Sequence, residues 1–540
     1  MCHLVVINTH PKNLSVKNQF GTSLIKHLTA LMELHVNQFV WGVAILIPSL
    51  LLLLRHKKSS HNRLPPGPPG WPIFGNMFDL GSMPHRTLAG LKNKYGPVVW
   101  LRIGAMNTMA VQSSKAAAEL FRNHDISFVE RTVTENMKSH NFDKSSLSLA
   151  PYGSYWRVLK RMMTVEMIVN KRINETVAIR RKCVDDMVSW IKKEAHAGKE
   201  SWRGIHLAHF VFLASFNMLG NLMLSKDLVE PEKEEGVEFF SAMVRLAEWV
   251  GHPNIVDLFP WLRWLDPQGL RKKTAGEMWK TMQIVSRFVK ERLQERQRGG
   301  PRKNDFLEVL LEFEGNGKGE QAKISDHDLN ILIMETFIAG TETTSGTMEW
   351  AMVELLSNPS VMSTLKDELN EVVGGGNKFQ EADIDKLKYL QAVVNETLRL
   401  HPPIPLLVPR KATQDTNFMG YNVPKGTQLF VNVWAIGRDP ECWENADTFR
   451  PERFLNSNID FKGNHFELIP FGAGRRMCAG VPLAHRMLHL VLGSLVHEFD
   501  WDVHNSVADD LRDTKESMGV VVKKTRPLIA IPISKNSPTS

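Results

Sequence analysis

The chain has 540 residues, 43% of them hydrophobic and 23% charged, which is the balance of a folded globular protein and not of a disordered one. Its net charge of +8 is spread along the sequence, which favours an anionic membrane surface or an acidic protein as a partner over nucleic acid. The four cysteines form no CxxC pair and have no regular spacing, which indicates neither a disulfide framework nor a structural zinc site.

Near the N-terminus, residues 39–54 form an apolar run that is followed at once by Arg55, Lys57 and Lys58. A membrane span normally needs about 20 apolar residues, and the preceding residues bring this run close to that length. We therefore expect one transmembrane helix, and the basic residues behind it predict that the rest of the chain faces the cytoplasm. A cleaved signal peptide is disfavoured because no small-residue cleavage site follows the run.

The segments around this anchor differ in character. Three lysines before the anchor weaken its charge asymmetry, and one hypothesis is that translation starts at Met32. After the anchor, the stretch LPPGPPGWPIFGN (64–76) is too rich in proline for a helix or an inner strand and predicts a stiff, extended connection. The expected organisation is an N-terminal extension (1–35), an anchor with its basic stop (36–58), a proline-rich hinge (59–76) and one globular domain (77–540).

In the globular domain, short β-like stretches at 98–103 and 109–111 precede a region up to about residue 400 in which helical patterns dominate. The expected fold class is mainly α with a minor β part. The Gly-rich segment 315–320 matches no nucleotide-binding motif and is predicted to be a solvated loop. The glycines at 374–376 are predicted to end a helix that begins after Pro359.

The longest helical pattern begins at Ser325, which can form a capping box with Asp328, and it runs without a breaker to Ser357. At 1.5 Å per residue, the pattern predicts a helix about 50 Å long that crosses the whole domain. Its middle reads AGTETT (339–344), where a glycine and three threonines lower the helix propensity. A weak point in the centre of such a helix indicates a functional site.

The most informative stretch is FGAGRRMCAG (471–480), which matches FxxGxRxCxG at each fixed position. Its glycines at 472 and 474 permit a tight turn, and Cys478 stands just before an apolar-periodic helix. The dipole and free N–H groups of a helix N-terminus lower the pKa of a thiol and stabilise the thiolate, which is the species that binds iron. A lone cysteine is more commonly a buried structural residue, but the matched positions around Cys478 outweigh that interpretation.

This stretch resembles the haem-binding loop of the cytochrome P450 family, and the resemblance extends from the proline-rich segment to the last predicted strands. It implies the cytochrome P450 fold behind a single N-terminal transmembrane helix. It also implies haem b (iron protoporphyrin IX) as the cofactor, with Cys478 as the thiolate ligand of the iron. Within the cofactor-binding loop, which includes Gly474 and Gly480, Phe471 is expected to shield the sulfur and Arg476 to contact a haem propionate.

Two further segments resemble propionate-binding parts of the family. PYGSYWRVLKR (151–161) is similar to the helix that gives a tryptophan and a basic residue to a propionate, here Trp156 and Lys160. The family usually has arginine at the second position, and lysine cannot make the bidentate contact that arginine makes. By its position after a proline-containing run, Arg410 is another propionate candidate.

Glu396 and Arg399 lie three residues apart on one helical face and can form an ion pair there. Such a pair alone would more commonly be a surface salt bridge. Because FRPERF (449–454) follows, the resemblance implies that Arg453 completes a buried network that braces the haem loop.

The resemblance also gives the weak helical segment a role. It implies that Ala339 and Gly340 belong to an oxygen-binding groove, and that Thr343 and Glu342 deliver protons to dioxygen. A second interpretation is that Thr343 bonds its own helix backbone, and both can hold together.

No flavin or nicotinamide fingerprint occurs in the sequence, so the electrons for the reaction must come from another protein. The resemblance implies NADPH-cytochrome P450 reductase, an endoplasmic reticulum membrane, and insertion of one atom of dioxygen into a small lipophilic substrate. The motifs are similar to those of plant microsomal members that oxidise monoterpenols and iridoids, so a terpenoid substrate is expected, with phenylpropanoids or flavonoids as the alternative. A haem-thiolate isomerase or dehydratase, or a haem carrier or gas sensor, would not need the Glu342–Thr343 pair.

The substrate pocket is expected to be apolar and lined by five parts of the chain, namely 128–149, Ala339, Thr343, 404–407 and 518–520. The histidine pairs at 206 and 209 and at 485 and 489 have no accompanying third ligand, and we interpret them as packing or surface residues.

Overall fold

The computed structural model describes residues 63–197, 204–230, 237–315, 323–502 and 515–534, which belong to one unit from Leu64 onward. The predicted N-terminal extension, the membrane anchor and most of the Gly-rich loop lie outside the described residues. Within the described part, helix is the main element and short strands are the minor one, as the sequence predicts.

The helices are η1 (Met77–Asp79), α2 (Pro84–Tyr95), α3 (Ser114–Asn123), η2 (Asn136–Asn141), α4 (Phe142–Ser145), α5 (Ser154–Arg161), η3 (Met162–Met167), α6 (Asn170–Glu175), α7 (Val177–Ala197), α8 (Leu207–Leu224), α9 (Val237–Gly251), α10 (Ile255–Leu258), η5 (Pro260–Leu262), α11 (Leu270–Gln297), α12 (Phe306–Glu312), α13 (Asp326–Ser357), α14 (Pro359–Val373), η6 (Glu381–Lys386), α15 (Lys388–Leu400), α16 (Val433–Ile436), η7 (Pro451–Phe454) and α17 (Val481–Glu498). The strands are β1 (Val98–Ile103), β2 (Met106–Val111), β3 (Glu130–Arg131), β4 (Ile205–His206), β5 (Arg410–Lys411), β6 (Thr416–Phe418), β7 (Tyr421–Val423), β8 (Gln428–Val431), β9 (Phe499–Asp502), β10 (Glu516–Met518), β11 (Val522–Lys524) and β12 (Ile529–Ser534).

Helix α13 is the long helix that the sequence predicts, and its bounds confirm that prediction. The Ser325 side chain accepts a hydrogen bond from Asp328 N at 3.1 Å, which caps the first turn. The helix ends at Ser357, because Pro359 begins α14 and disfavours helical backbone in the residue before it. The predicted glycine stop is also confirmed, since α14 ends at Val373 and Gly374 follows with a φ of +81°.

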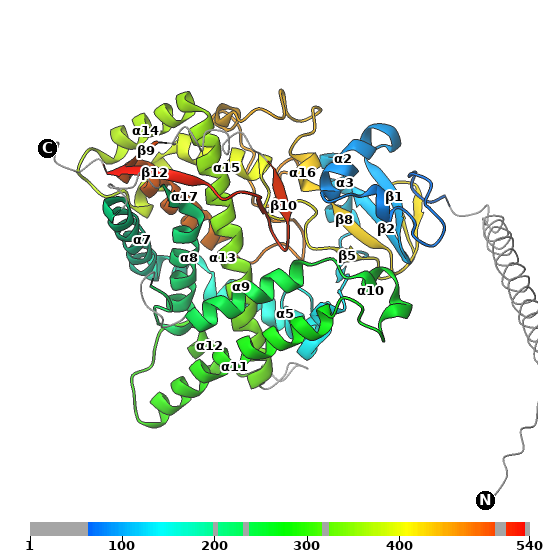
Figure 1. Cartoon of the computed structure of the whole chain (residues 1–540), viewed down its shortest axis with the longest axis horizontal. Coiled ribbons are helices and arrows are strands. Elements are labelled where there is room, and N and C mark those ends of the chain that lie inside the picture. The colour runs from blue at the N-terminus through cyan, green and yellow to red at the C-terminus, as the bar shows by residue number, and fades with distance from the viewer. Residues whose placement is uncertain (1–62, 198–203, 231–236, 316–322, 503–514, 535–540) are drawn as a thin grey trace, which may run out of the picture. The chain divides into compact units, whose positions relative to one another are not determined.

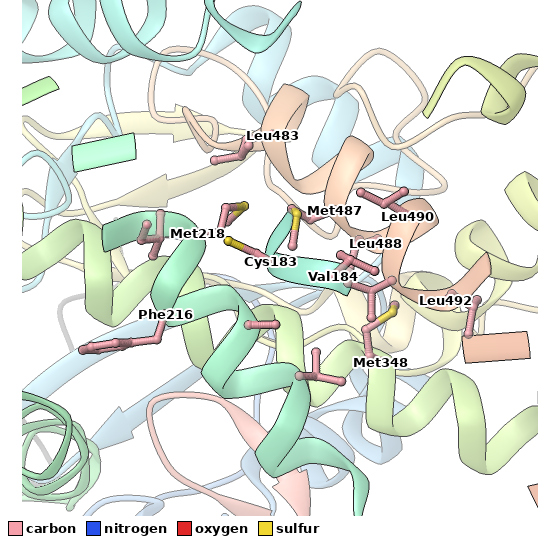
Figure 2. Close-up of a cluster of buried hydrophobic side chains, with 14 of the residues drawn as sticks. Cys183, Val184, Phe216, Met218, Met348, Leu483, Met487, Leu488, Leu490 and Leu492 are labelled. Atoms are coloured by element: carbon pink, nitrogen blue, oxygen red, sulfur yellow. The ribbon is translucent and has the colours of Figure 1, made fainter. Parts of the chain in front are cut away.

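The main hydrophobic core lies where α13 packs with α7, α8 and α17. Figure 2 shows side chains from these four helices pointing toward one another, among them Cys183, Met218, Met348 and Leu488. Full burial of each such side chain stabilises the fold by roughly 1.5–3 kcal/mol. In the described part of the chain, α8 is the helix that is long and apolar enough to cross a membrane, but most of its residues are buried in this core.

The largest sheet has the strand order β1-β2-β8-β5-β3, with β2 and β8 parallel and the other pairs antiparallel. In Figure 1 this sheet lies to one side of the unit, the core helices lie to the other, and α13 runs between them. The register places Arg131 of β3 opposite Arg410 of β5. Two segments that are far apart in the sequence thus bring their arginines together at one edge of the sheet.

The proline-rich stretch 64–76 lies against β1 and is part of this unit. Pro66 O accepts a hydrogen bond from Trp100 N at 2.8 Å, and Asn76 N donates to Arg102 O at 2.5 Å. A Cβ on Gly67 would lie 1.8 Å from Trp100 O, so glycine is what permits this close approach of the two backbones.

Candidate active site

The cysteine loop is held by its own backbone and by two glycines in left-handed conformations. Cys478 N donates to Phe471 O at 3.1 Å, which closes the loop, and the Phe471 ring packs on that of Phe461. Gly472 and Gly474 have φ values of +72° and +70°. A Cβ on Gly474 would also lie 2.6 Å from Asp125 Oδ1, so this position needs glycine for its backbone and for its space.

The Cys478 thiol lies just before α17, and its Sγ accepts a hydrogen bond from Gly480 N at 3.3 Å. The sequence predicts that the helix end lowers the pKa of this thiol. In the structure the side chain keeps an exposed surface, yet loss of hydration raises the pKa, although the Gly480 N–H and Lys160 act to lower it. The prediction of a lowered pKa is therefore wrong, and coordination to a metal cation has to favour the thiolate.

A cluster of three arginines adjoins the cysteine loop: Arg131 from β3, Arg410 from β5 and Arg476 from the loop itself. Arg410 donates to Ala473 O at 3.0 Å, and Arg476 donates to Val129 O at 3.0 Å. All three side chains are buried. Burial, and then the nearby charges of Arg410 and Arg476, hold the pKa of Arg131 well below its ordinary value. Burial likewise lowers the pKa of Arg476 to about 10.

This cluster carries more positive than negative charge. Asp125 accepts from Arg410 Nη1 at 2.7 Å and from Arg475 Nη1 at 2.9 Å, which anchors β5 to the loop. Among the described residues, Arg131 and Arg476 form no ion pair and donate to backbone carbonyls instead. Because buried charge of one sign is costly without a counter-charge, the donor set fits a ligand that carries carboxylates, as haem does in its two propionates.

Trp156 and Lys160 of α5 both reach the cysteine loop. The Arg476 guanidinium lies 4.5 Å from the centre of the Trp156 ring, a cation–π contact. Lys160 Nζ donates to Met477 O at 2.7 Å, next to the cysteine, and burial lowers the pKa of this lysine. Lys160 stands where the family usually has arginine, and its ammonium group donates to one backbone carbonyl of the cysteine loop.

The weak segment of α13 keeps an uncovered face inside a helix that is otherwise largely buried. Ala339 is exposed and Thr343 is half-buried, whereas residues 344–353 are all buried. The Thr343 hydroxyl donates to Ala339 O at 2.7 Å. This is the bond to its own helix backbone that the sequence offers as the second interpretation of Thr343. Gly340 has a packing reason as well, since a Cβ there would lie 2.9 Å from Leu219 Cδ1 of α8.

The Glu342 carboxylate of this segment forms an ion pair with Lys523 of β11 at 2.7 Å. The pair connects α13 to the β10–β11 hairpin, whose turn contains two of the residues predicted to line the pocket. Val522 N of the same hairpin donates to Pro403 O at 2.9 Å, next to the predicted lining segment 404–407. The hairpin therefore connects α13 with the segment that follows α15.

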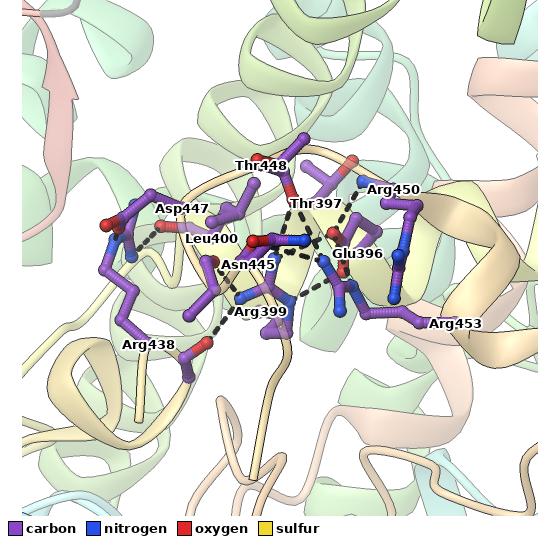
Figure 3. Close-up of polar contacts among 12 residues, drawn as sticks. Glu396, Thr397, Arg399, Leu400, Arg438, Asn445, Asp447, Thr448, Arg450 and Arg453 are labelled. Carbon is purple, nitrogen blue, oxygen red and sulfur yellow. Dashed lines mark hydrogen bonds and ion pairs between the residues drawn. The ribbon is translucent and has the colours of Figure 1, made fainter. Parts of the chain in front are cut away.

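Glu396, Arg399 and Arg453 lie together in one network, which Figure 3 shows. The Glu396 carboxylate accepts two bonds from Arg399, at 2.6 and 2.7 Å, and one from Arg453 Nε at 3.0 Å. Arg450 N also donates to it at 2.8 Å, and Arg399 donates onward to Ala446 O and Thr448 O. Glu396 and Arg399 are both fully buried on α15. Their bonds to residues 446–453 connect this helix with the segment that leads into the cysteine loop.

Sequence reasoning missed three residues of this site, namely Arg131, Asp125 and Lys523. Each lies in a short segment without helical or strand periodicity, and its partner is more than 150 positions away. Only the strand register and the packing of the hairpin bring these residues to the site. Of the histidines interpreted as packing or surface residues, His489 is buried and its Nδ1 contacts His485 O at 2.6 Å, whereas His206 and His209 are exposed.

Comparison with known proteins agrees with this geometry. The family model "Cytochrome P450" matches residues 65–531. Cytochrome P450 76A2 from Solanum melongena is 52% identical over 93% of this chain and 99% of its own length. Iridoid oxidase from Catharanthus roseus is 51% identical over 91% of this chain and 96% of its own, and geraniol 8-hydroxylase from the same plant is 39% identical over 87% and 94%. A zebra fish cytochrome P450, solved with progesterone, covers 84% of this chain and 99% of its own at a TM-score of 0.71 and 26% identity.

The chain therefore belongs to the cytochrome P450 family, and it is a haem-thiolate monooxygenase. Haem bound through a cysteine thiolate supplies the activation of dioxygen, with one oxygen atom inserted into a lipophilic substrate and the other reduced to water by electrons from a redox partner. Here Cys478 is the residue available as the thiolate ligand, and the arginine cluster and Trp156 are available for the propionates.

Proposed function

We propose that this enzyme oxidises a small terpenoid, a monoterpenol or an iridoid, with dioxygen and electrons from NADPH. The similarity of nearly the whole chain to iridoid oxidase and to geraniol 8-hydroxylase is the observation that carries this proposal. The residues predicted to line the pocket are largely apolar, which suits such a substrate. In this proposal Thr343 and Glu342 pass protons toward dioxygen, and Gly340 and Ala339 leave room for it beside the cofactor.

The experiment that tests the proposal has two stages. Microsomes that contain the full chain are reduced and exposed to carbon monoxide, beside a Cys478→Ser variant, and a thiolate-type Soret band absent from the variant is expected. The same microsomes are then given NADPH with geraniol, an iridoid, or a phenylpropanoid. Oxidation of a terpenoid supports the proposal, whereas turnover of the phenylpropanoid alone selects the alternative substrate class.

The enzyme is proposed to take its electrons from NADPH-cytochrome P450 reductase, because its own sequence has no flavin or nicotinamide fingerprint. Turnover in the reconstituted system should require both the reductase and NADPH. Product formed with NADPH in the absence of any reductase would contradict this assignment.

We further propose that the enzyme sits on the endoplasmic reticulum membrane with its catalytic unit in the cytoplasm. Besides the predicted anchor at 36–58, a patch of exposed apolar side chains on the catalytic unit supports this; it consists of Trp71, Ile73, Phe74, Phe78, Trp261, Trp264 and Leu265. The patch is contiguous, since Phe74 packs on Phe259 and Phe259 packs on Trp261. Tryptophan-rich apolar surfaces are typical of contacts with the membrane interface.

A truncated chain that begins at residue 63 tests this patch apart from the anchor. It should bind vesicles of neutral and anionic lipid, and a variant with Trp261 and Trp264 changed to serine should bind about tenfold more weakly, because two interfacial aromatic side chains are lost. Equal partition of both forms into the vesicle fraction would rule out the patch as a lipid contact. The carbon monoxide spectrum checks that both forms are folded.

A further inference from the structure

The loop of residues 146–150 is held from two sides, and one of its partners has no role in the site described above. That partner is Glu335 on α13. Its carboxylate accepts from Leu147 N through Oε2 and from Ser148 N through Oε1, each at 2.7 Å. Two successive backbone N–H groups of the loop are thus bound by one side chain of the central helix.

The carbonyl groups of the same loop bind the opposite side of the site. Leu147 O accepts from Trp156 Nε1 at 2.9 Å, Ser148 O from Arg131 Nε at 3.1 Å, and Ala150 O from Arg476 Nη2 at 2.6 Å. These three donors are the tryptophan and two of the arginines assigned above to the propionates. The loop therefore joins α13 to the groups that are available for the cofactor.

Glu335 lies on the same face of α13 as the uncovered segment. Positions 335, 339 and 343 follow each other at intervals of four, so their side chains form one row along the helix. The loop held by Glu335 belongs to the stretch 128–149 that the sequence predicts to line the pocket. Its Leu147 side chain is partly buried and packs against the core, and the Leu147 N–H is bound by Glu335 of this row.

We propose that Glu335 is a positioning residue that holds the 146–150 loop against α13 and thereby sets where Leu147 meets the substrate. Through this contact Glu335 selects which carbon of the terpenoid is presented for oxidation. The inference rests on the proposed function for its substrate, but the contact itself does not depend on it. Fixing a lining side chain in this way matters because a misplacement of about 1 Å can cost on the order of a hundredfold in rate.

The first arm of the test is hydrogen exchange in the holoprotein. The exchange rates of the amides at 147 and 148 report on the contact with Glu335 and do not depend on catalytic turnover. In Glu335→Gln one carboxylate oxygen is replaced by an amide NH₂ that faces a backbone N–H, so one of the two bonds is lost. Amides 147 and 148 should then exchange about tenfold faster. Glu349→Gln is the matched control, because Glu349 is another glutamate of α13 whose carboxylate accepts a backbone N–H, from Leu528 at 2.8 Å, away from the loop.

The second arm is the ratio of oxidation products from geraniol, which offers more than one carbon for oxidation. Glu335→Gln should change this ratio by about tenfold and Glu349→Gln should leave it unchanged. Leu147→Ala keeps the backbone contact, so it should change the ratio while exchange at Ser148 stays as in the wild type.

Unchanged exchange in Glu335→Gln, or an equal effect of Glu349→Gln in either arm, overturns the role given to Glu335. An unchanged product ratio in Leu147→Ala overturns the part given to that side chain. If the wild-type enzyme does not oxidise geraniol, the proposed substrate fails, and the exchange arm still decides whether Glu335 holds the loop.

Discussion

At the scale of single residues, Glu396 illustrates how much one buried carboxylate can hold. It accepts from two arginines and one backbone N–H, and neither Glu396 nor Arg399 has exposed surface. Glu396→Ala would leave the Arg399 charge buried without its partner, at a cost of about 3–5 kcal/mol. We expect the variant to fail to incorporate haem, as measured by the haem-to-protein ratio and the carbon monoxide spectrum.

Glu238→Ala is the matched control for that variant. Glu238 also pairs with an arginine, Arg287, but both side chains are exposed, so the loss should stay below about 1 kcal/mol. Holoprotein of Glu396→Ala at normal yield would contradict the bracing role of the buried network.

Thr343 is the second residue whose role can be tested alone. We expect Thr343→Ala to keep its haem but to form less product for each NADPH consumed, because a proton donor near dioxygen is lost. Thr336→Ala is the control, since its hydroxyl makes the same bond to the carbonyl four residues earlier, at 2.8 Å, on the same helix. If both variants keep the wild-type ratio of product to NADPH, Thr343 has only the helical role that its bond to Ala339 O describes.

At the scale of elements, the cysteine loop depends on one glycine more than on the others. Gly474→Ala adds a Cβ at a φ of +70° and 2.6 Å from Asp125 Oδ1, the carboxylate that anchors Arg410. We expect haem content to fall sharply, as measured by the absorbance ratio of the Soret band to the protein band. Gly426→Ala is the control, because Gly426 has a φ of +82° and nothing within 4 Å of an added Cβ.

The control isolates backbone strain, which should cost about 1 kcal/mol and leave haem content normal. Equal haem loss in the two variants would mean that strain alone decides the result and that the contact with Asp125 does not.

At the scale of the whole molecule, two histidines on α17, the buried His489 and the half-buried His485, make stability depend on pH. Burial, and then the charge of His485, lowers the pKa of His489 to about 3, and burial lowers that of His485 to about 4. Both titrate near pH 6.5 in an unfolded chain, so below about pH 6.5 the unfolded state binds more protons than the folded one. This contribution to stability is complete above pH 6.5 and is lost progressively as the pH falls toward 3.

We therefore expect the melting temperature of the holoprotein to fall between about pH 7.5 and 5.5, and to fall less steeply in His489→Phe. Removing one titrating group should reduce the slope of the unfolding free energy by up to about 1.4 kcal/mol per pH unit. The loss of the bond from His489 to His485 O lowers stability at every pH. The comparison is therefore between the pH dependences of the two melting temperatures and not between their absolute values. Parallel curves for the two proteins would show that His489 does not carry the effect.

Local sequence determines much of this protein. Capping and an unbroken apolar pattern are properties of neighbouring residues, and they define α13 from its cap at Ser325 to its end at Ser357 and the stop of α14 at Gly374. The strand at 98–103 and the fold class follow in the same way. Cys478, Glu396 and Arg399 could be identified because each stands in a motif whose spacing is fixed by one loop or one helical turn.

Tertiary structure alone decides what depends on distant partners. Arg131 meets Arg410 through a strand pairing, Lys523 meets Glu342 because a hairpin packs on α13, and Glu335 meets Leu147 across the site. The thiol pKa belongs here too, because the Cys478 motif predicts the stabilising helix end but not the loss of hydration that outweighs it. Hydrogen bonds and burial act between neighbours in space, so residues far apart in the chain show these interactions only once the fold is known.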